Sequence, residues 1–406
     1  MTTIYLKKHK EESVLRYHPW VFSGAIGHIN GKAEEGDTVC VRSADGEPLG
    51  VGHWQEGSIA VRLLEFNMAS LPQDLWQQRI AAAYRMRQTL GLISEQNNTY
   101  RLVHGEGDFL PGLIIDIYGD TAVMQAHSAG MHKARKEIAA ATMAAVEGLR
   151  NVYYKSESTL PLKKHFIDIE DGYLIAADQQ TTQAEETHWA RENGLEFKID
   201  WLHGQKTGFF VDQRENRGLL ERYAYGRRVL NMFCYTGGFS VYALRGGAEH
   251  VCSVDSSEKA IELVRENVER NFKHCTRHEA VSADAFSFLS TAQERQKKEG
   301  EAKYDLIVLD PPAFAKHRGA IRNALQGYKR LNAKAIEQIA SGGILFTFSC
   351  SQAVDKEMFR LAVFSAAAMT GRKVRILHQL TQPQDHPVNI YQPEGEYLKG
   401  LVLYVE

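Results

Sequence analysis

The sequence has little cysteine and no long hydrophobic run. Its 406 residues include five cysteines, none arranged as a CxxC pair, which argues against a disulfide framework or a zinc site. No apolar stretch approaches the roughly 18 residues that a membrane-spanning helix needs, and residues 1–10 lack the apolar segment of a signal peptide. We therefore expect a cytoplasmic protein with no metal site and no membrane partner, in which any functional cysteine acts as a thiol.

The chain also lacks an excess of positive charge. Its net charge of −2 gives no sign of a nucleic-acid partner, but a global sum can hide a local run. Between Asp310 and Glu337 there is no acidic residue, whereas this stretch contains six basic ones: Lys316, Arg318, Arg322, Lys329, Arg330 and Lys334. Such a run indicates either a solvated helix face or a surface that binds phosphates. The position of the run in the fold determines which of these two interpretations applies.

The length and the changing patterns predict three domains. Short apolar segments broken by glycines suggest a small β-rich domain over residues 1–71. Helical spacing begins near Pro72, and strand-like segments around Gly119 and Asp120, a hairpin signal, indicate a small α+β domain over 72–190. The third domain is expected over residues 191–406.

In the third domain, strand-like apolar segments alternate with helical ones. We predict strands at residues 227–233, 250–257, 279–286, 303–312 and 342–351. Strands joined through helices must run parallel, so the pattern predicts an α/β domain with a doubly wound sheet. Ligands bind such sheets beyond the carboxyl ends of the strands.

A glycine turn and two acidic residues follow the first three of these strands. Tyr235, Thr236 and Gly237 form a turn where backbone can approach a ligand, and they do not match the GxGxxG pattern of dinucleotide sites. Asp255 ends the second strand, where it can accept hydrogen bonds from ribose hydroxyls, and Asp284 could contact an adenine amino group. The series indicates another adenosine-containing ligand; the alternative is that the acids only cap the next helices.

The fourth strand ends in Asp-Pro-Pro-Ala-Phe. The two prolines force an extended exit, which holds Asp310 at the edge of the sheet, where it can bind a ring nitrogen or amino group of a base. Phe314 offers a ring for stacking. The element is typical of methyltransferases that act on planar nitrogen-containing groups, and the alternative is a simple stop after the strand.

The fifth strand brings Cys350 to the same edge. Most free cysteines are small buried hydrophobes, and this is our interpretation of Cys40, Cys252 and Cys275. Cys350 differs because it lies between two serines at a strand end. Carbon 5 of cytosine is a poor nucleophile until a thiolate adds at carbon 6, so a thiol here fits 5-methylcytosine formation. The basic run begins at the same rim, which favours RNA contact by Lys316, Arg318 and Arg322.

Several segments resemble one known family. They are GQKTGFFVDQRENR (204–217), NMFCYTGGFS (231–240), DPPAF (310–314), TFSCS (347–351) and DHPVNIYQPEGEYLKG (385–400). Together they make the chain similar to the RlmI-type bacterial 23S ribosomal RNA cytosine-C5 methyltransferases. HPWVFSGAI (18–26) resembles the N-terminal PUA domain of that family, and residues 100–119 resemble its middle domain.

The resemblance implies a PUA RNA-binding domain, a central α+β domain and a class I S-adenosylmethionine methyltransferase domain with a Rossmann-like sheet. It implies that Cys350 is the nucleophile and that 23S rRNA, free or in a large-subunit assembly intermediate, is the substrate. The residues implied to border S-adenosylmethionine are Lys206, Thr207, Asp212, Phe233, Tyr235, Gly237, Asp255, Asp284 and Asp310. Thr236 joins them from the turn described above, and a homodimer is a further expectation.

The chain departs from the family pattern at two places. Ala313 occupies a position where a lysine or a similar polar residue is expected, and the N-terminal region is not clearly basic. In addition, many RNA cytosine methyltransferases carry a second cysteine after the proline of this element, whereas here Pro312 and Ala313 occupy that place. Release of the product must then use another base.

The sequence therefore predicts a methyltransferase in which Asp310 and Cys350 are catalytic. Two alternatives stay open at this stage. One is an N-methyltransferase that acts on an exocyclic amine through the DPPAF element, with Cys350 as a bystander. The other is an RNA-binding protein with a degenerate methyltransferase fold, against which the presence of Asp255, Asp284, Asp310 and Cys350 argues.

Overall fold

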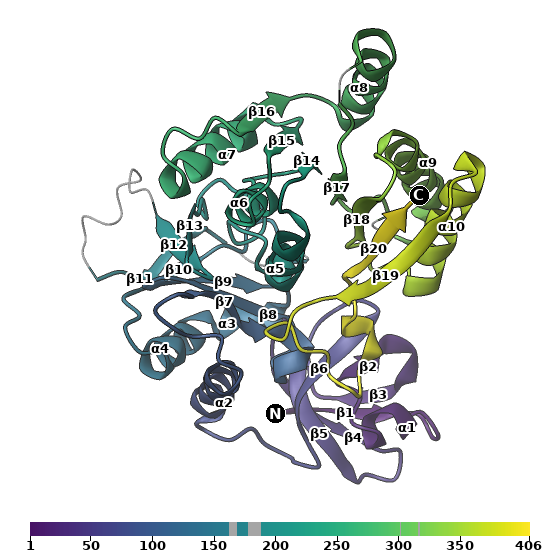
Figure 1. The fold of residues 1–406 in the computed structure, drawn as a ribbon. Coiled ribbons are helices and arrows are strands. Elements are labelled where there is room, and N and C mark those ends of the chain that lie inside the picture. The colour runs from purple at the N-terminus through teal and green to yellow at the C-terminus, as the bar shows by residue number, and fades with distance from the viewer. Residues whose placement is uncertain (162–168, 178–187, 301, 316) are drawn as a thin grey trace. The chain divides into compact units, whose positions relative to one another are not determined.

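The chain forms two compact units (Figure 1). The computed structural model describes residues 1–406 except 162–168, 178–187, 301 and 316, and it leaves undescribed the side chains of 295–297, 299 and 318. The first unit comprises Met1–Gly194, Ile199–Val211 and Gln384–Gly395; the second comprises Leu195–Lys198, Asp212–Pro383 and Glu396–Glu406. Each unit is therefore assembled from three separate stretches of the chain.

The N-terminal part of the first unit is rich in strands, as predicted. In the described part of the chain its sheet has six strands in the order β2-β6-β5-β4-β1-β3. The bounds are β1 Thr2–Leu6, β2 Trp20–Phe22, β3 Ile26–Asn30, β4 Thr38–Arg42, β5 Pro48–Trp54 and β6 Ile59–Phe66, with the short helix α1 at Glu12–Leu15. Apolar residues from these strands, among them Ile4, Val39 and Leu63, are buried together and form a separate core.

A second sheet follows in the same unit, with the order β11-β10-β9-β8-β7. Its strands are β7 Thr99–His104, β8 Leu113–Tyr118, β9 Thr121–Ala126, β10 Asn151–Tyr154 and β11 Gly172–Ile175, and its helices are α2 Leu75–Thr89, α3 Ala129–Lys133 and α4 Arg135–Ala145. Strands β8 and β9 form the hairpin that Gly119-Asp120 predicted. Strand β12, Trp189–Glu192, also belongs to this unit.

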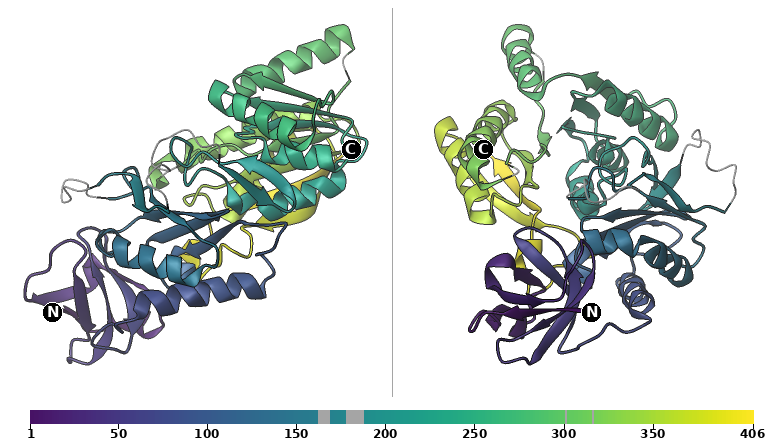
Figure 2. Two further views of the ribbon diagram at one scale, coloured as in Figure 1. Left: turned by 90° about the vertical axis from the view of Figure 1, so that its left-hand side faces the viewer. Right: turned by 180° about the vertical axis from the view of Figure 1, so that it is seen from behind.

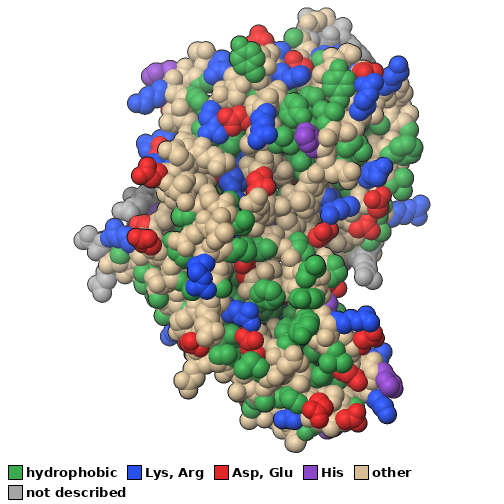
Figure 3. All heavy atoms as spheres, turned by 60° about the horizontal axis from the view of Figure 1, so that its bottom comes forward, with side chains coloured by type: hydrophobic (Ala, Val, Ile, Leu, Met, Phe, Trp, Pro, Cys, Tyr) green, Lys and Arg blue, Asp and Glu red, His purple; other side chains and the backbone are tan. Residues whose placement is uncertain are grey.

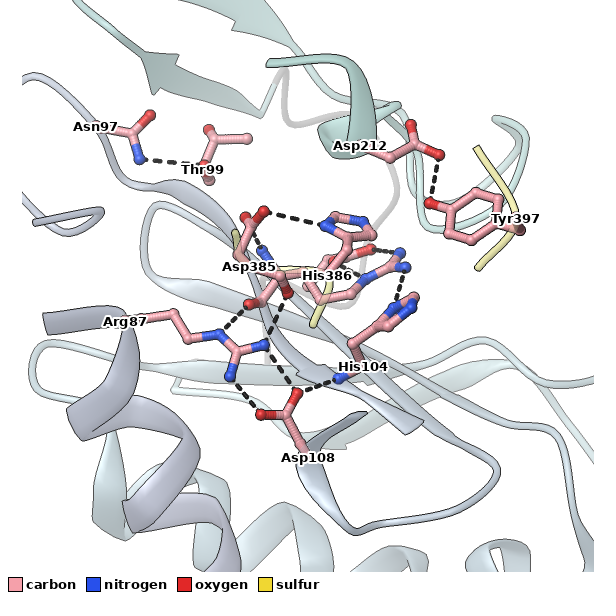
Figure 4. A network of polar contacts seen from close by, with 11 residues as sticks. Arg87, Asn97, Thr99, His104, Asp108, Asp212, Asp385, His386 and Tyr397 are labelled. Atoms are coloured by element: carbon pink, nitrogen blue, oxygen red, sulfur yellow. Dashed lines mark hydrogen bonds and ion pairs between the residues drawn. The ribbon is translucent and has the colours of Figure 1, made fainter. Parts of the chain in front are cut away.

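A buried ionic network ties the segment Gln384–Gly395 into the first unit (Figure 4). The Arg87 guanidinium binds both carboxylate oxygens of Asp108 and donates to the backbone carbonyl of Asp385 at 2.7 Å. The Asp385 carboxylate accepts the backbone N–H of Arg101 at 3.0 Å and contacts the His386 ring at 3.0 Å. Because buried charges must be paired, these contacts explain how a C-terminal segment joins an N-terminal unit, which the sequence analysis did not anticipate.

The second unit contains the predicted α/β sheet. Its seven strands within the described residues have the order β16-β15-β14-β17-β18-β20-β19. The bounds are β14 Arg228–Met232, β15 His250–Asp255, β16 His278–Ser282, β17 Leu306–Leu309, β18 Gly343–Ser349, β19 Val374–Thr381 and β20 Lys399–Val405. Strands β14 to β18 pair in parallel, whereas β20 runs antiparallel to both of its neighbours.

Helices cover both faces of this sheet (Figure 2). They are α5 Arg214–Tyr223, α6 Gly238–Arg245, α7 Glu258–Asn271, α8 Ala285–Glu299, α9 Ile321–Gln338 and α10 Lys356–Thr370; the short strand β13, Leu195–Lys198, also belongs here. Side chains of β14, β15 and β17 form one core with α8, α9 and α10. On the other face the buried hydroxyl of Ser240 in α6 bonds the amide of Asn231 and the hydroxyl of Ser253.

The surface is mixed in charge. Among the described side chains on the face drawn in Figure 3, Lys and Arg are interspersed with Asp and Glu, in keeping with the net charge of −2. Within the described residues, no helix has both the length and the apolar character required to cross a membrane.

Candidate active site

The candidate site lies at one edge of the sheet in the second unit. Strands β14, β15, β17 and β18 are neighbours and end close to one another. Met232 and Leu309, the last residues of β14 and β17, pair with each other, and they pair with Val254 and Thr347, respectively, near the ends of β15 and β18. Parallel strands end at a common edge, so the loops after these four strands come together there. The predicted residues Phe233 to Gly237, Asp310 and Cys350 belong to these loops, and Asp255 is the last residue of β15.

The turn after β14 has an unusual backbone. Phe233, Tyr235 and Gly237 have φ angles of 58°, 47° and 79°, a region that residues other than glycine enter rarely. A Cβ atom at Gly237 would lie 3.0 Å from a methyl group of Val264 in α7, so glycine is needed there for space as well as for conformation. Strained backbone of this kind concentrates at ligand sites, because the surrounding packing must maintain it.

Asp255 holds this turn in place. One oxygen of its carboxylate accepts the backbone N–H of Tyr235 at 3.0 Å, and the other accepts the N–H of Ser257 at 3.0 Å. The carbonyl of the buried Thr236 in turn accepts the side-chain amide of Asn267 at 2.8 Å. A carboxylate has about four acceptor positions, so Asp255 keeps capacity for ribose hydroxyls. The helix-capping alternative does not apply to Asp255, since Ser257 is the residue that caps α7.

Asp284, by contrast, does cap a helix. Strand β16 ends at Ser282, earlier than predicted, and the Asp284 carboxylate accepts the backbone N–H of Ser287 at 2.9 Å at the start of α8. Hydrogen bonds from that backbone N–H and from the Ser287 side chain lower the pKa of Asp284. The capping role weighed for the acids is thus observed at this position, and contact with adenine stays a prediction.

Asp310 follows β17 and is held by a residue that the sequence analysis missed. The side-chain amide of Gln213 donates to the Asp310 carboxylate at 3.0 Å, and Asn216 donates to the Gln213 carbonyl oxygen at 2.6 Å. Both amide side chains are buried. This chain of hydrogen bonds fixes the orientation of the Asp310 carboxylate. Gln213 and Asn216 lie in the 204–217 segment that resembles the family, and this position was the only sign in the sequence that they belong to the site.

Cys350 follows β18 as a partly exposed thiol, not part of a disulfide, between two fully buried serines. Ser349 donates to the Tyr328 hydroxyl at 2.9 Å, and Ser351 donates to the Ala315 carbonyl at 2.6 Å, so both flanking residues are fixed. Burial raises the pKa of Tyr328, and the charges of Cys350 and Asp310 raise it further. Both groups therefore lie within electrostatic range of the same tyrosine.

The residues predicted to contact RNA are only partly covered by the structure. The Phe314 ring packs on Tyr328, with ring centroids 4.6 Å apart, and is partly buried. Arg322 is exposed in the first turn of α9. Lys316 and the side chain of Arg318 lie outside the described residues. RNA contact by these residues stays a prediction.

Three further residues implied by the family resemblance lie before α5. Asp212 is buried in the second unit, and its carboxylate accepts the Tyr397 hydroxyl at 2.8 Å (Figure 4). Lys206 and Thr207 belong to the first unit. The Thr207 hydroxyl is fully buried and donates to Asp116 at 2.6 Å, so its side chain anchors its own loop. Cofactor contact by all three stays a prediction.

Comparison with known proteins identifies the class. A model of the S-adenosylmethionine-dependent methyltransferase family matches residues 173–392, more than half of the chain, and a PUA-like domain model matches residues 4–66. A protein described as a SAM-dependent methyltransferase from Streptococcus mutans has the same fold, with a TM-score of 0.82 at 23% identity over 100% of both chains. The protein is thus a SAM-dependent methyltransferase with an N-terminal PUA-like domain.

Closer relatives define the family. "Ribosomal RNA large subunit methyltransferase I" of Tolumonas auensis is 40% identical over 99% of both chains. The protein of the same name from Aeromonas hydrophila is 39% identical over 99% of this chain and 98% of its own. The chain belongs to the ribosomal RNA large subunit methyltransferase I family, which confirms the resemblance seen in the sequence motifs.

Proposed function

We propose that this enzyme methylates carbon 5 of a cytosine in the RNA of the large ribosomal subunit, with Cys350 as the nucleophile. The observation that carries the proposal is the half-buried Cys350 thiol at the end of β18, the strand that pairs with β17, which Asp310 follows. The names of the relatives indicate that the substrate is RNA of the large ribosomal subunit. The thiol indicates that a carbon of the base is methylated rather than a nitrogen. An RNA substrate of this kind also implies that the enzyme acts in the cytoplasm.

The loops at the sheet edge fit the cofactor of the family. The positive-φ turn from Phe233 to Gly237 brings backbone to the edge, and the Asp255 carboxylate beside it retains acceptor positions for ribose hydroxyls. When bound, S-adenosylmethionine supplies an electrophilic methyl group. A solved methyltransferase in complex with SAH has a TM-score of 0.84 with this chain, at 23% identity. That likeness supports the fold on which this assignment rests.

The chain's own residues would carry the remaining steps. Asp310, oriented by Gln213, accepts hydrogen bonds from the amino group of the cytosine, and Phe314 offers its ring for stacking. The thiolate of Cys350 adds to carbon 6, which makes carbon 5 nucleophilic. After methyl transfer, water or a base other than a second cysteine would take the proton from carbon 5, and the electron pair of that bond re-forms the C5–C6 double bond as the sulfur–carbon bond breaks. Cys350 then leaves as thiolate.

RNA contact is proposed for the exposed basic side chains of α9. Arg322 and Arg330 are exposed on this helix, in the stretch that contains no acid before Glu337. Cations in that position would neutralise phosphates next to the base-binding edge, and such contacts weaken with salt. The segment Lys316–Arg322 would be the part nearest to DPPAF in the sequence.

The proposal is tested with Cys350→Ala and RNA that contains 5-fluorocytosine. With S-adenosylmethionine present, the wild-type enzyme should form a protein–RNA adduct that survives denaturation, since after methyl transfer the fluorine at carbon 5 cannot leave as a proton does and the final elimination is blocked. Cys350→Ala should lose both the adduct and turnover, while its affinity for S-adenosylmethionine, measured by calorimetry, stays within about twofold. Cys275→Ala, which removes another partly exposed thiol, is the matched control and should behave as wild type.

Methylation that persists in Cys350→Ala would refute the mechanism and favour the N-methyltransferase alternative. Absence of cofactor binding by the wild-type protein would favour the degenerate RNA-binding alternative. Bisulfite sequencing of ribosomal RNA from cells with and without the protein then identifies the cytosine whose methylation depends on it.

A further inference from the structure

Next to the proposed nucleophile lies a buried cation that the mechanism above does not use. Lys399 begins β20 and pairs in register with Ser349, the residue before Cys350 on β18. Lys399 is only 5% exposed. Its ammonium group donates to the backbone carbonyl of Ser351 at 2.6 Å and to that of Val354 at 2.6 Å. The cation is therefore fixed against the loop that begins directly after the thiol.

A buried lysine in this place calls for an explanation. Lysine is almost never fully buried unless it is paired, because removing an ammonium group from water is costly. Backbone carbonyls supply hydrogen bonds but no full negative charge. Burial lowers the pKa of Lys399 to about 8, while the charges of Cys350 and Asp355 act in the opposite direction. The charged lysine is thus favoured by a negatively charged Cys350, and by reciprocity Lys399 favours the thiolate.

Among the described residues, the other charged groups around the thiol do not replace this effect. Asp310 follows β17, the strand next to β18, Tyr328 lies in α9, and Asp355 caps α10 after the loop. The negative charges of Asp310 and Asp355 would raise the pKa of a nearby thiol rather than lower it, and Tyr328, whose own pKa is raised by burial, is uncharged near neutral pH. Lys356 and Glu396, which also act on Lys399, form an exposed ion pair with each other at 2.8 Å, so their opposite charges largely cancel.

We propose that Lys399 is the positioning residue that keeps Cys350 in its reactive thiolate form. Its ammonium group stabilises the negative sulfur, and its two hydrogen bonds fix the 351–354 loop behind the nucleophile. The proton of the thiol leaves to water before the base binds, and Lys399 keeps its own proton throughout. This inference rests on the proposed role of Cys350 as the nucleophile.

The test measures the ionisation of the Cys350 thiol in the full chain without RNA or cofactor. The rate of alkylation by iodoacetamide is followed between pH 5 and 10, and the modified peptide is quantified by mass spectrometry to separate Cys350 from the other four cysteines. In the wild-type protein the Cys350 pKa should lie below the ordinary thiol value of about 8.5. A wild-type pKa at or above that value overturns the proposal without any variant.

Three variants separate charge from hydrogen bonding. Lys399→Gln keeps a donor but removes the charge, and it should raise the Cys350 pKa by about one unit, which is a tenfold smaller thiolate fraction near neutral pH. Lys399→Arg keeps the charge and should stay close to wild type. Lys356→Gln combined with Glu396→Gln removes the exposed ion pair close to the same loop without a change in net charge and is the matched control, with no shift expected.

The outcomes are decisive in both directions. An unchanged Cys350 pKa in Lys399→Gln, or an equal rise in Lys399→Arg, means that Lys399 acts only through packing and overturns the proposal. If Lys399→Gln does not fold, as judged by thermal melting, the wild-type titration and the Lys399→Arg protein decide. In the methylation assay, activity of Lys399→Gln should recover as the pH is raised, which a structural defect would not allow.

Failure of the two proposals can be told apart. The thiol titration needs no turnover, so it stays valid if Cys350→Ala proves active and the nucleophile assignment falls. In the converse case, the adduct requires Cys350 while the Cys350 pKa has its ordinary value. That result would support Cys350 as the nucleophile and would exclude the proposed role of Lys399.

Discussion

Arg87 in α2 allows the buried network of the first unit to be tested quantitatively. Its side chain is 0% exposed, and its guanidinium donates to the Arg101 carbonyl at 2.8 Å, to both oxygens of Asp108 and to the Asp385 carbonyl at 2.7 Å. Arg87→Met keeps much of the apolar stem but removes all of these donors. Asp108 then keeps the backbone N–H of His104, at 2.6 Å, as a donor.

The expected loss follows from the charge that stays behind. Breaking a buried ion pair by removing one partner destabilises a protein by about 3–5 kcal/mol, because the remaining charge is buried without compensation. A carbonyl left without its donor adds about 1–3 kcal/mol, although local relaxation keeps the effects from adding fully. We expect Arg87→Met to lower the free energy of unfolding of the first unit by about 4 kcal/mol. Arg87→Met with Asp108→Asn should recover roughly 2 kcal/mol of this, since no charge is then stranded.

The assay is urea unfolding followed by tryptophan fluorescence. All five tryptophans, Trp20, Trp54, Trp76, Trp189 and Trp201, belong to the first unit, so the signal reports that unit. Arg85→Met, which changes an exposed arginine on the same helix, is the control and should stay within about 0.5 kcal/mol. A loss below about 1 kcal/mol in Arg87→Met, or a double variant that is no more stable than the single one, would refute the reasoning.

Three further outcomes are expected. Asp255→Asn should weaken binding of S-adenosylmethionine about 10- to 100-fold in calorimetry, because hydrogen bonds to a charged acceptor contribute about 1.5–3 kcal/mol and the neutral amide of asparagine lacks the charge and has a donor in place of one acceptor oxygen. An unchanged affinity would exclude a ribose contact. Gly107→Ala should destabilise the first unit by about 1–3 kcal/mol in urea unfolding, since a Cβ atom there would lie 1.9 Å from the Pro387 carbonyl oxygen. Gly24→Ala is the control and should be neutral, because a Cβ atom at Gly24 meets no atom within 4 Å. Burial lowers the pKa of His53 to about 4, so below pH 6.5 the unfolded chain takes up a proton that the folded chain does not. Stability should therefore fall between pH 6.5 and 4 by at most about 1.4 kcal/mol per unit from this group, and a slope that His53→Leu leaves unchanged would contradict the assignment.

Much of the second unit could be predicted from the sequence because its signals are local. The alternation of apolar strands and amphipathic helices gives the parallel sheet, and a strand end is visible where an apolar run meets Asp255 or Asp310. Edges of parallel strands converge by topology, so residues far apart in sequence could be assigned to one site without coordinates. The C-terminal strands were harder: the antiparallel insertion of β20 between β18 and β19 depends on long-range pairing that no local pattern encodes.

Side-chain partners could not be predicted, since an acid after a strand fits more than one role. Asp255 and Asp284 have the same sequence signature, yet Asp255 holds the turn at Tyr235 and Asp284 caps α8. The difference arises from where each helix begins, and Ser257 supplies the cap that Asp255 would otherwise provide. Nothing in the residue type of Gln213 indicates a role in the site. Its role follows only from its hydrogen bond to the Asp310 carboxylate.

Cys350 shows most clearly what position contributes beyond residue type. Its neighbours in sequence are two serines, and neither can lower the pKa of a thiol as a full positive charge does. The cation that can do so is Lys399, which reaches the loop only because β20 pairs with β18 in a register that aligns Lys399 with Ser349. A shift of one residue in that register would turn the lysine to the other face of the sheet. The antiparallel strand therefore connects the fold to the reactivity of the thiol, and the titration of Lys399→Gln tests that connection directly.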